Sequence, residues 1–264
     1  MYHIIVCMKI VPDPEMPFSI FKVDRENRKP IPPAGSQPVV SPFDENALEA
    51  ALRIKDRREC RVTVLSMGKA VPRAILQKTL AMGADDVIPI EGAELENLGG
   101  FSTAHALSCA IRRLAPYDLV FTGRQAADWD GGIVWAGIAE HLDLPSVTIA
   151  RKAEIADGRV IVERCASDGI ETVEADMPAI VTFSSEVGET RNVSIQALMK
   201  VKKRNIVKWA AEDLGFEKME TMELAELYEP DLGLIDCCLI PGDTAEEKGR
   251  NLARMLFQEN ILHQ

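Results

Sequence analysis

Short apolar runs of strand length alternate with helix-periodic stretches through the first 145 residues, and this alternation constrains the fold most strongly. Near-continuous apolar runs linked by helices are typical of parallel strands that are covered on both faces. The pattern therefore predicts a doubly wound, mostly parallel α/β sheet. The expected strands are 3–8, 61–67, 86–90 and 118–122, and the expected helices are 41–57, 72–82, about 101–114 and 131–142.

The helix expected from residue 41 has a well-marked start. Ser41 can serve as N-cap and Pro42 can occupy the first helical position. Asp44 follows within the first turn, where a carboxylate interacts favourably with the helix dipole.

After Pro145 the pattern changes to short β-branched runs at 146–155, 159–164, 171–174 and 179–183. Asp157-Gly158 and Asp168-Gly169 separate some of them, and such pairs favour antiparallel hairpins. We expect two or three antiparallel strands to extend the sheet, with 179–183 returning to its core.

The chain is acidic, with 30 Lys and Arg against 41 Asp and Glu and a formal net charge of −11. This balance disfavours binding to nucleic acid or anionic lipid.

The sequence has neither a membrane-length apolar run nor a signal-peptide pattern, which predicts a cytoplasmic protein without membrane insertion. The scattered Cys and His residues have no metal-ligand spacing, so we expect no metal site.

Most of the net negative charge lies in the tail, where residues 209–264 hold thirteen acidic and four basic residues. The tail contains an expected strand at 234–240 and an amphipathic helix at 244–260. Between 213 and 231 it offers few core residues. It is therefore either an arm that lies on another protein or an arm that folds back on its own domain.

The loop at 123–132, GRQAADWDGG, follows an expected strand and opens an expected helix. Its three glycines allow main-chain N–H groups and the helix N-terminus to approach a phosphate. Ligands of open parallel sheets bind at this edge, beyond the carboxyl ends of the strands. The alternative is a capping loop whose Asp128 and Asp130 only accept main-chain hydrogen bonds. Neither aspartate has a neighbouring His or Cys, so acid–base catalysis is not expected.

A basic run at 198–208, LMKVKKRNIVK, stands out in this acidic chain. It follows the apolar residues Val193 and Ile195. Such a run is ordinarily a solvated helix face, but the apolar lead-in also suits a docking segment for an acidic partner.

Motifs along nearly the whole chain resemble the electron-transfer flavoprotein beta subunit, or FixA, family. The motifs are VCMKIVPDP (6–14), SPFDENALEAALRIK (41–55), TVLSMGKA (63–70), LAMGADDVIPI (80–90), GRQAADWD (123–130), EHLDLPSVT (140–148), ERCASDGIETV (163–173), MPAIVT (177–182) and LMKVKK (198–203). Each motif is weak alone, but their joint order and spacing are specific.

The resemblance implies an adenine nucleotide alpha hydrolase-like fold and an electron carrier rather than a stand-alone enzyme. Such a chain pairs with an alpha subunit that mainly holds the redox FAD. It moves electrons from an acyl-CoA-type dehydrogenase to a quinone reductase or another acceptor. The beta subunit itself binds AMP or, in electron-bifurcating members that use NADH, a second FAD.

The resemblance also implies roles for residues and segments of this chain. It implies a nucleotide-binding domain at 1–192, a partner-recognition segment at 193–208 and an arm on the alpha subunit at 209–264. The recognition segment would use Ile195 as its apolar anchor, with Leu198, Met199, Lys200, Lys202 and Lys203. The nucleotide contacts would be Cys7, Ser41, Pro42, Phe43, Asp44, Met67, Arg124, Gln125, Ala126, Ala127, Asp128, Trp129, Asp130, Gly131, Gly132, Ile133 and Val134.

Departures from the family pattern leave the nucleotide's identity open. Gly131 and Gly132 stand where the family commonly continues with threonine and glutamine, and Ser41 replaces an asparagine. The stretch Val11-Pro12-Asp13-Pro14 is more similar to bifurcating members, which favours FAD over AMP. A rival of another class is an adenine-nucleotide-sensing regulatory module, for which the basic run would have no purpose.

Overall fold

The computed structural model describes residues 1–17, 20–219, 223–229 and 237–261. The chain forms two compact units, Met1–Leu227 and Tyr228–Gln264. The division at 192 and 208 expected from the sequence concerns function, and it stays a prediction.

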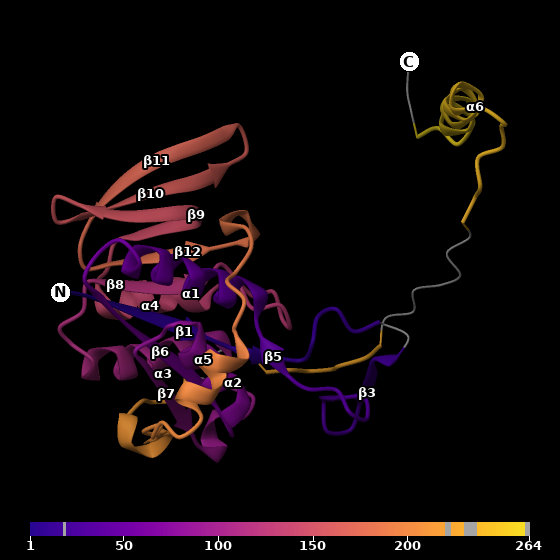
Figure 1. Ribbon diagram of the computed structural model, residues 1–264. Coiled ribbons are helices and arrows are strands. Elements are labelled where there is room, and N and C mark those ends of the chain that lie inside the picture. The colour runs from indigo at the N-terminus through magenta and orange to yellow at the C-terminus, as the bar shows by residue number, and fades with distance from the viewer. Residues whose placement is uncertain (18–19, 220–222, 230–236, 262–264) are drawn as a thin grey trace. The chain divides into compact units, whose positions relative to one another are not determined.

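A nine-stranded sheet forms the centre of Met1–Leu227, in the order β11-β10-β9-β12-β8-β1-β6-β7-β13 (Figure 1). Its parallel part confirms the predicted fold class. These strands are β1 (Tyr2–Met8), β6 (Cys60–Gly68), β7 (Asp86–Glu91), β8 (Leu119–Gly123), β12 (Ala179–Phe183) and the short β13 (Trp209–Ala210). Two small ribbons, β2 (Ile10–Val11) with β5 (Val39–Val40) and β3 (Lys22–Asp24) with β4 (Lys29–Ile31), lie between β1 and the first helix.

The antiparallel extension is also as predicted, and consists of β9 (Ser146–Ala156), β10 (Arg159–Ala166) and β11 (Gly169–Asp176). In the first hairpin Asp157 and Gly158 both have positive φ, 50° and 78°, as a two-residue type I′ turn requires. In the second, Ser167 and Asp168 form the loop and Gly169 already belongs to β11. The strand β12 returns to the core between β8 and β9.

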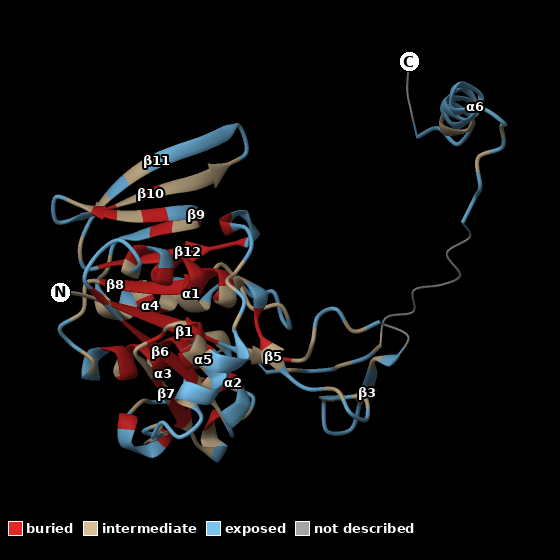
Figure 2. Cartoon of the chain, in the orientation of Figure 1, coloured by how far each residue is buried: buried red, intermediate tan, exposed pale blue. Residues whose placement is uncertain are grey.

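Helices cover both faces of the sheet. The first face carries α1 (Pro42–Lys55) and α2 (Arg73–Met82), whose apolar residues join Val6 and Val64 in one buried cluster. The second carries α3 (Gly100–Arg113) and α4 (Val134–Leu142), which pack with Ile5 and Leu65 in another. Figure 2 shows the buried residues concentrated in the central strands and α1.

Two expectations need correction. The helix α4 begins at Val134 and not at Gly131, because Asp130 and Gly132 adopt positive φ, 49° and 60°, which α-helix does not accept. Of the strand expected at 234–240, residues 237–240 are not in a strand, and the remainder lies outside the described residues.

The first part of the acidic tail folds back on its own unit. Leu214, in the short helix η4 (Ala211–Leu214), is buried against α3's cluster, and Phe216 packs beside it. The Met219 N–H donates to Ser102 Oγ at 2.8 Å. Two further short helices, η2 (Ala93–Leu95) and η3 (Ser185–Val187), lie in loops of the same unit.

The unit Tyr228–Gln264 contains α6 (Ala245–Gln258), which confirms the helix predicted at 244–260. Thr244 caps it by accepting the Glu247 N–H. None of its described residues is buried, and Leu252 and Phe257 are exposed. Across the described residues, every helix is too short or too polar to cross a membrane.

Candidate functional site

The strand order reverses between β1 and β8. From β1 the chain moves to β6 and β7 on one side, and then crosses to β8 on the other side of β1. The carboxyl ends of these neighbours lead into Lys9 and Arg124. A reversal of this kind opens a crevice at the strand ends, which is where ligands of doubly wound sheets bind.

The start of α1, Ser41 to Asp44, joins the two strand ends. Asp44 Oδ2 accepts the Lys9 N–H and its Oδ1 accepts the Gly123 N–H, each at 2.8 Å. Ser41 is the N-cap residue, but its hydroxyl does not cap the helix and instead accepts the Ala127 N–H at 3.3 Å. This segment therefore contacts both β1's end and the loop 124–133.

Arg124 lies over the same segment. Its guanidinium carbon is 4.8 Å from the centre of the Phe43 ring, within the range of a cation–π contact. Its main-chain N–H donates to Phe183 O at 2.8 Å. Its buried Nε has no hydrogen-bond partner among the described residues. Buried donors are ordinarily hydrogen-bonded, so this unpaired donor stands out beside the loop.

Lys9 connects the first strand to the loop a second time. Its Nζ lies 2.7 Å from Asp128 Oδ2, and the Asp128 side chain is only 16% exposed. Neither Lys9 nor Gly123 is among the contact residues expected from the sequence, although both stand directly at the ends of apolar runs.

The end of the loop offers free hydrogen-bond donors. Within the described part of the chain, the N–H groups of Gly131, Gly132 and Ile133 have no acceptor. A Cβ added at Gly131 would meet nothing within 4 Å, so the space in front of it is open. Ile133, the N-cap residue of α4, makes no side-chain cap. Neither Asp128 nor Asp130 caps α4, because Asp128 binds Lys9 and the Trp129 N–H while Asp130 accepts from Gln125.

The remaining expected contacts lie around this edge. Cys7 is buried near the end of β1 on α3's side, where burial and then the charge of Asp44 raise the pKa of its thiol to about 12. It is therefore a neutral packing group and not a nucleophile. Met67 packs on the same side near the end of β6. Trp129, within the loop, is 57% exposed, and Ala126, Pro42 and Val134 complete the set.

The electrostatics of Asp44 are unusual. Burial raises the pKa of this carboxyl to about 7, and the hydrogen bonds from Lys9 and Gly123 and the Lys9 charge oppose that rise. The neighbouring Asp128 carboxylate adds to the rise. A carboxyl group that titrates near neutral pH at a ligand edge marks a functional candidate.

Replacing Gly123 with alanine is expected to destabilise the protein. The new Cβ would lie 2.6 Å from Asp44 Oδ1 and 2.8 Å from the Phe43 Cβ. Such overpacking costs roughly 1–3 kcal/mol, measurable as a shift in the urea midpoint. Gly68→Ala is the matched control, because its Cβ would meet nothing within 4 Å at the end of β6. Equal midpoints for the two variants would contradict the tight fit at Gly123.

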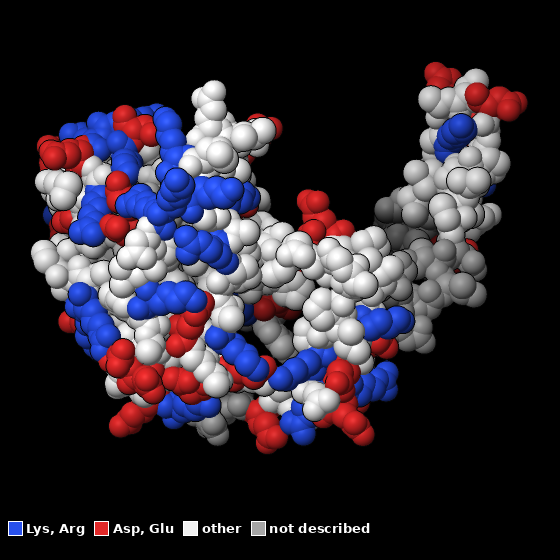
Figure 3. Space-filling model, turned by 60° about the horizontal axis from the view of Figure 1, so that its bottom comes forward, with Lys and Arg blue, Asp and Glu red and all other residues white. Residues whose placement is uncertain are grey.

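The expected recognition segment forms α5 (Ile195–Val201), capped by Ser194. Ile195 is 80% exposed and Met199 62%, while Leu198 is less exposed at 37%. Lys200, Lys202 and Lys203 are exposed and have no ion-pair partner among the described residues. On the face drawn in Figure 3, Lys and Arg lie among Asp and Glu. Ion pairs of the described surface include Arg57 with Glu154 and Arg151 with Glu163.

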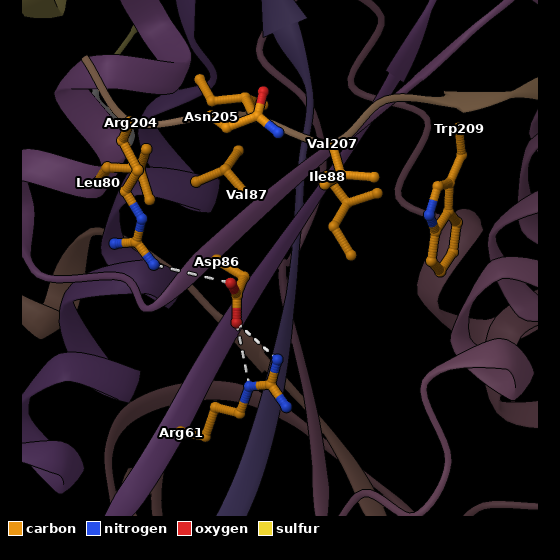
Figure 4. Close-up of a pocket in the computed structure, with 10 residues that line it drawn as sticks. Arg61, Leu80, Asp86, Val87, Ile88, Arg204, Asn205, Val207 and Trp209 are labelled. Carbon is orange, nitrogen blue, oxygen red and sulfur yellow. Dashed lines mark hydrogen bonds and ion pairs between the residues drawn. The ribbon is translucent and has the colours of Figure 1, made fainter. Parts of the chain in front are cut away.

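The chain after α5 lines a cavity of about 220 Å³ together with residues of β6 and β7 (Figure 4). Asp86 Oδ2 accepts hydrogen bonds from Arg61 Nε at 3.0 Å and Arg61 Nη2 at 2.7 Å. Its Oδ1 lies 3.7 Å from Arg204 Nη2, as an ion pair. Trp209 forms another wall. This cavity is at the amino ends of β6 and β7, and no residue of the loop 124–133 lines it.

Comparison with known proteins gives consistent matches. The family described as "Electron transfer flavoprotein domain" matches residues 34–214. "Electron transfer flavoprotein subunit beta" of Thermoanaerobacterium thermosaccharolyticum is 37% identical over 83% of this chain and 82% of its own. "Caffeyl-CoA reductase-Etf complex subunit CarD" of Acetobacterium woodii is 34% identical over 81% and 80%. "Protein FixA" of Azotobacter vinelandii is 31% identical over 84% and 79%.

Proposed function

The chain belongs to the electron-transfer flavoprotein beta subunit (FixA) family, and on that premise we propose that it binds an adenine nucleotide at the β1–β8 edge as one half of a heterodimeric electron carrier. Its alpha subunit would hold the redox FAD. Electrons would arrive from an acyl-CoA-type dehydrogenase and leave to a quinone reductase or another acceptor.

One observation carries the proposal: at the point where strand order reverses, the N–H groups of residues 131–133 have no acceptor among the described residues, and a Cβ added at Gly131 would meet nothing within 4 Å. Main-chain donors in that position suit phosphate oxygens. The Arg124 guanidinium, stacked on Phe43, adds a positive charge to the same edge. Phosphate would be held by these groups, and the adenosine would lie beside Ser41, Met67 and Trp129.

The chain's own residues bind and orient, and none is placed to break a substrate bond. The flavin supplies the electron transfer when it is bound, and the protein sets its position and surroundings. Of the described residues, no group of three or more His, Cys, Asp and Glu could hold a metal ion.

Isolation of the chain with its alpha subunit tests this function. The expected product is a yellow heterodimer whose denatured extract contains flavin together with AMP or a second flavin. A colourless complex without adenine nucleotide would reject both the carrier and the binding site. A colourless complex that retains AMP alone would favour the regulatory module.

The electron-bifurcating form is the second candidate, with FAD at this edge and NADH as donor. It is favoured by Val11-Pro12-Asp13-Pro14, which is more similar to bifurcating members of the family. A second flavin in the extract, with NADH bleaching the flavin spectrum, would support it. AMP in place of that flavin would exclude it.

Reversing the charges of Lys200, Lys202 and Lys203 to glutamate is expected to slow reduction by the partner dehydrogenase. Exposed, unpaired cations act mainly by speeding encounter with an acidic surface, so the loss should be about tenfold or more at low salt. Stopped-flow flavin reduction at several ionic strengths measures it. The control reverses Lys22, Arg25 and Arg58, which are also exposed. An identical salt dependence in the two variants would show that α5 is ordinary surface.

A further inference from the structure

The Asp44 carboxylate is not free to contact a ligand, since it is 7% exposed and both of its oxygens accept main-chain N–H groups at 2.8 Å. Its two donors are far apart in the sequence. Lys9 is the first residue after β1, and Gly123 is the last residue of β8. These strands are neighbours at the reversal of strand order.

We propose that Asp44 is a positioning residue that locks the ends of β1 and β8 together and thereby holds the loop 124–133 in the form that receives the nucleotide. This inference rests on the proposed function and adds to it a residue that acts through the main chain and not by touching the ligand.

The two bonds are strongest with an ionised carboxylate, which accepts at both oxygens. In asparagine an NH₂ group, which can only donate, replaces one of those oxygens, so the main-chain N–H at that position loses its acceptor and one strand end would be released. A protonated acid keeps two oxygens, but its hydroxyl oxygen is a weaker acceptor, so one of the two bonds would be weakened. The fit at Gly123 leaves little room for the carboxylate to move aside.

The two hydrogen bonds of Asp44 with Lys9 and Gly123, called the lock below, are connected to the loop 124–133. Lys9 donates its main-chain N–H to Asp44 and its Nζ to Asp128, so one residue connects the lock to the middle of the loop. Ser41, three residues before Asp44, accepts the Ala127 N–H. Release at Lys9 or Gly123 would therefore reach the middle of the loop, at Ala127 and Asp128.

The lock is expected to respond to pH. The titratable groups around Asp44 are Cys7 on β1, Lys9 after it and Asp128 on the loop. Cys7 stays neutral, because burial raises the pKa of its thiol to about 12. Burial raises the pKa of Asp44 itself to about 7. Below that pH the carboxyl gains a proton, one of its two hydrogen bonds is weakened, and nucleotide binding should weaken.

Binding of FAD to the full chain tests the proposal, with Asp44→Asn as the variant and Glu45→Gln as the matched control on the same turn. FAD is a suitable probe because its diphosphate does not titrate between about pH 5.5 and 8.5, unlike a terminal phosphate with a pKa near 6. At pH 8, D44N should bind at least about tenfold more weakly than wild type, as the loss of a charged hydrogen bond predicts. Wild type should weaken as pH falls through about 7. D44N should show no such change, and E45Q should follow wild type.

Amide hydrogen exchange in the nucleotide-free protein separates the lock from the proposed function. The Lys9 and Gly123 amides should exchange faster in D44N than in wild type at the same pH, with the β10–β11 hairpin unchanged. Unaltered exchange together with wild-type FAD affinity would overturn the proposal. If wild type bound neither FAD nor AMP, the proposed function would fail, and slow exchange at these amides would still establish the lock. The wild-type pH series decides the matter even if D44N does not fold.

Discussion

Replacing both Gly131 and Gly132 with valine is expected to lower the adenine nucleotide retained by the purified protein by about tenfold or more. A side chain at Gly131 would enter open space in front of the free N–H groups. Gly132 has φ of +60°, a conformation that a β-branched residue adopts only with strain, so valine would also turn its N–H away. Acid extraction followed by chromatography measures the retained nucleotide.

The control for that substitution is Gly158→Val. Gly158 also has positive φ, +78°, and nothing within 4 Å of an added Cβ, but it lies in the β9–β10 turn. The control should therefore carry comparable backbone strain and leave nucleotide content unchanged. Full retention by the Gly131 and Gly132 variant would contradict the placement of the phosphate.

The stability of Asp44→Asn relative to wild type is expected to rise with pH. Burial raises the pKa of Asp44 from 3.8 to about 7, so the folded protein holds this proton more tightly than the unfolded chain. Wild type therefore loses stability as pH rises between these two values, and the asparagine variant does not. The change in the stability difference should approach about 4 kcal/mol, since each unit of pKa corresponds to about 1.4 kcal/mol.

Urea unfolding of both proteins at a series of pH values measures this difference. All other titrating groups are common to the two proteins and cancel in the comparison. A difference that stays constant from acidic to alkaline pH would contradict the raised pKa. With the expected result, Asp44 would be a residue that costs stability at neutral pH and is explained by its effect on the loop, as functional residues often are.

Much of the fold could be predicted because it follows from local patterns. Apolar runs and helical periodicity located the parallel strands and their helices, and Asp157-Gly158 located a hairpin whose turn needs two positive φ angles. The predicted start of α4 was three residues too early, because hydrophobic periodicity does not show that Asp130 and Gly132 adopt positive φ angles.

The candidate site was predicted only in outline. A glycine-bearing loop after a strand indicates an anion site, and the motifs indicate the family. The sequence suggested Ser41 as a helix cap, whereas its hydroxyl accepts from Ala127, 86 residues away. Lys9 and Asp128 are 119 residues apart, and no window of sequence contains both.

The sequence by itself therefore determined the class of the sheet, the hairpin extension and the family of the chain. The tertiary structure alone decided that Asp44 joins Lys9 to Gly123 and that the start of the acidic tail packs on α3. The physical reason is the separation in sequence between the residues that make contact. Strand and helix patterns arise from neighbours in the chain, whereas these contacts exist only after strand order and helix packing have brought distant residues together.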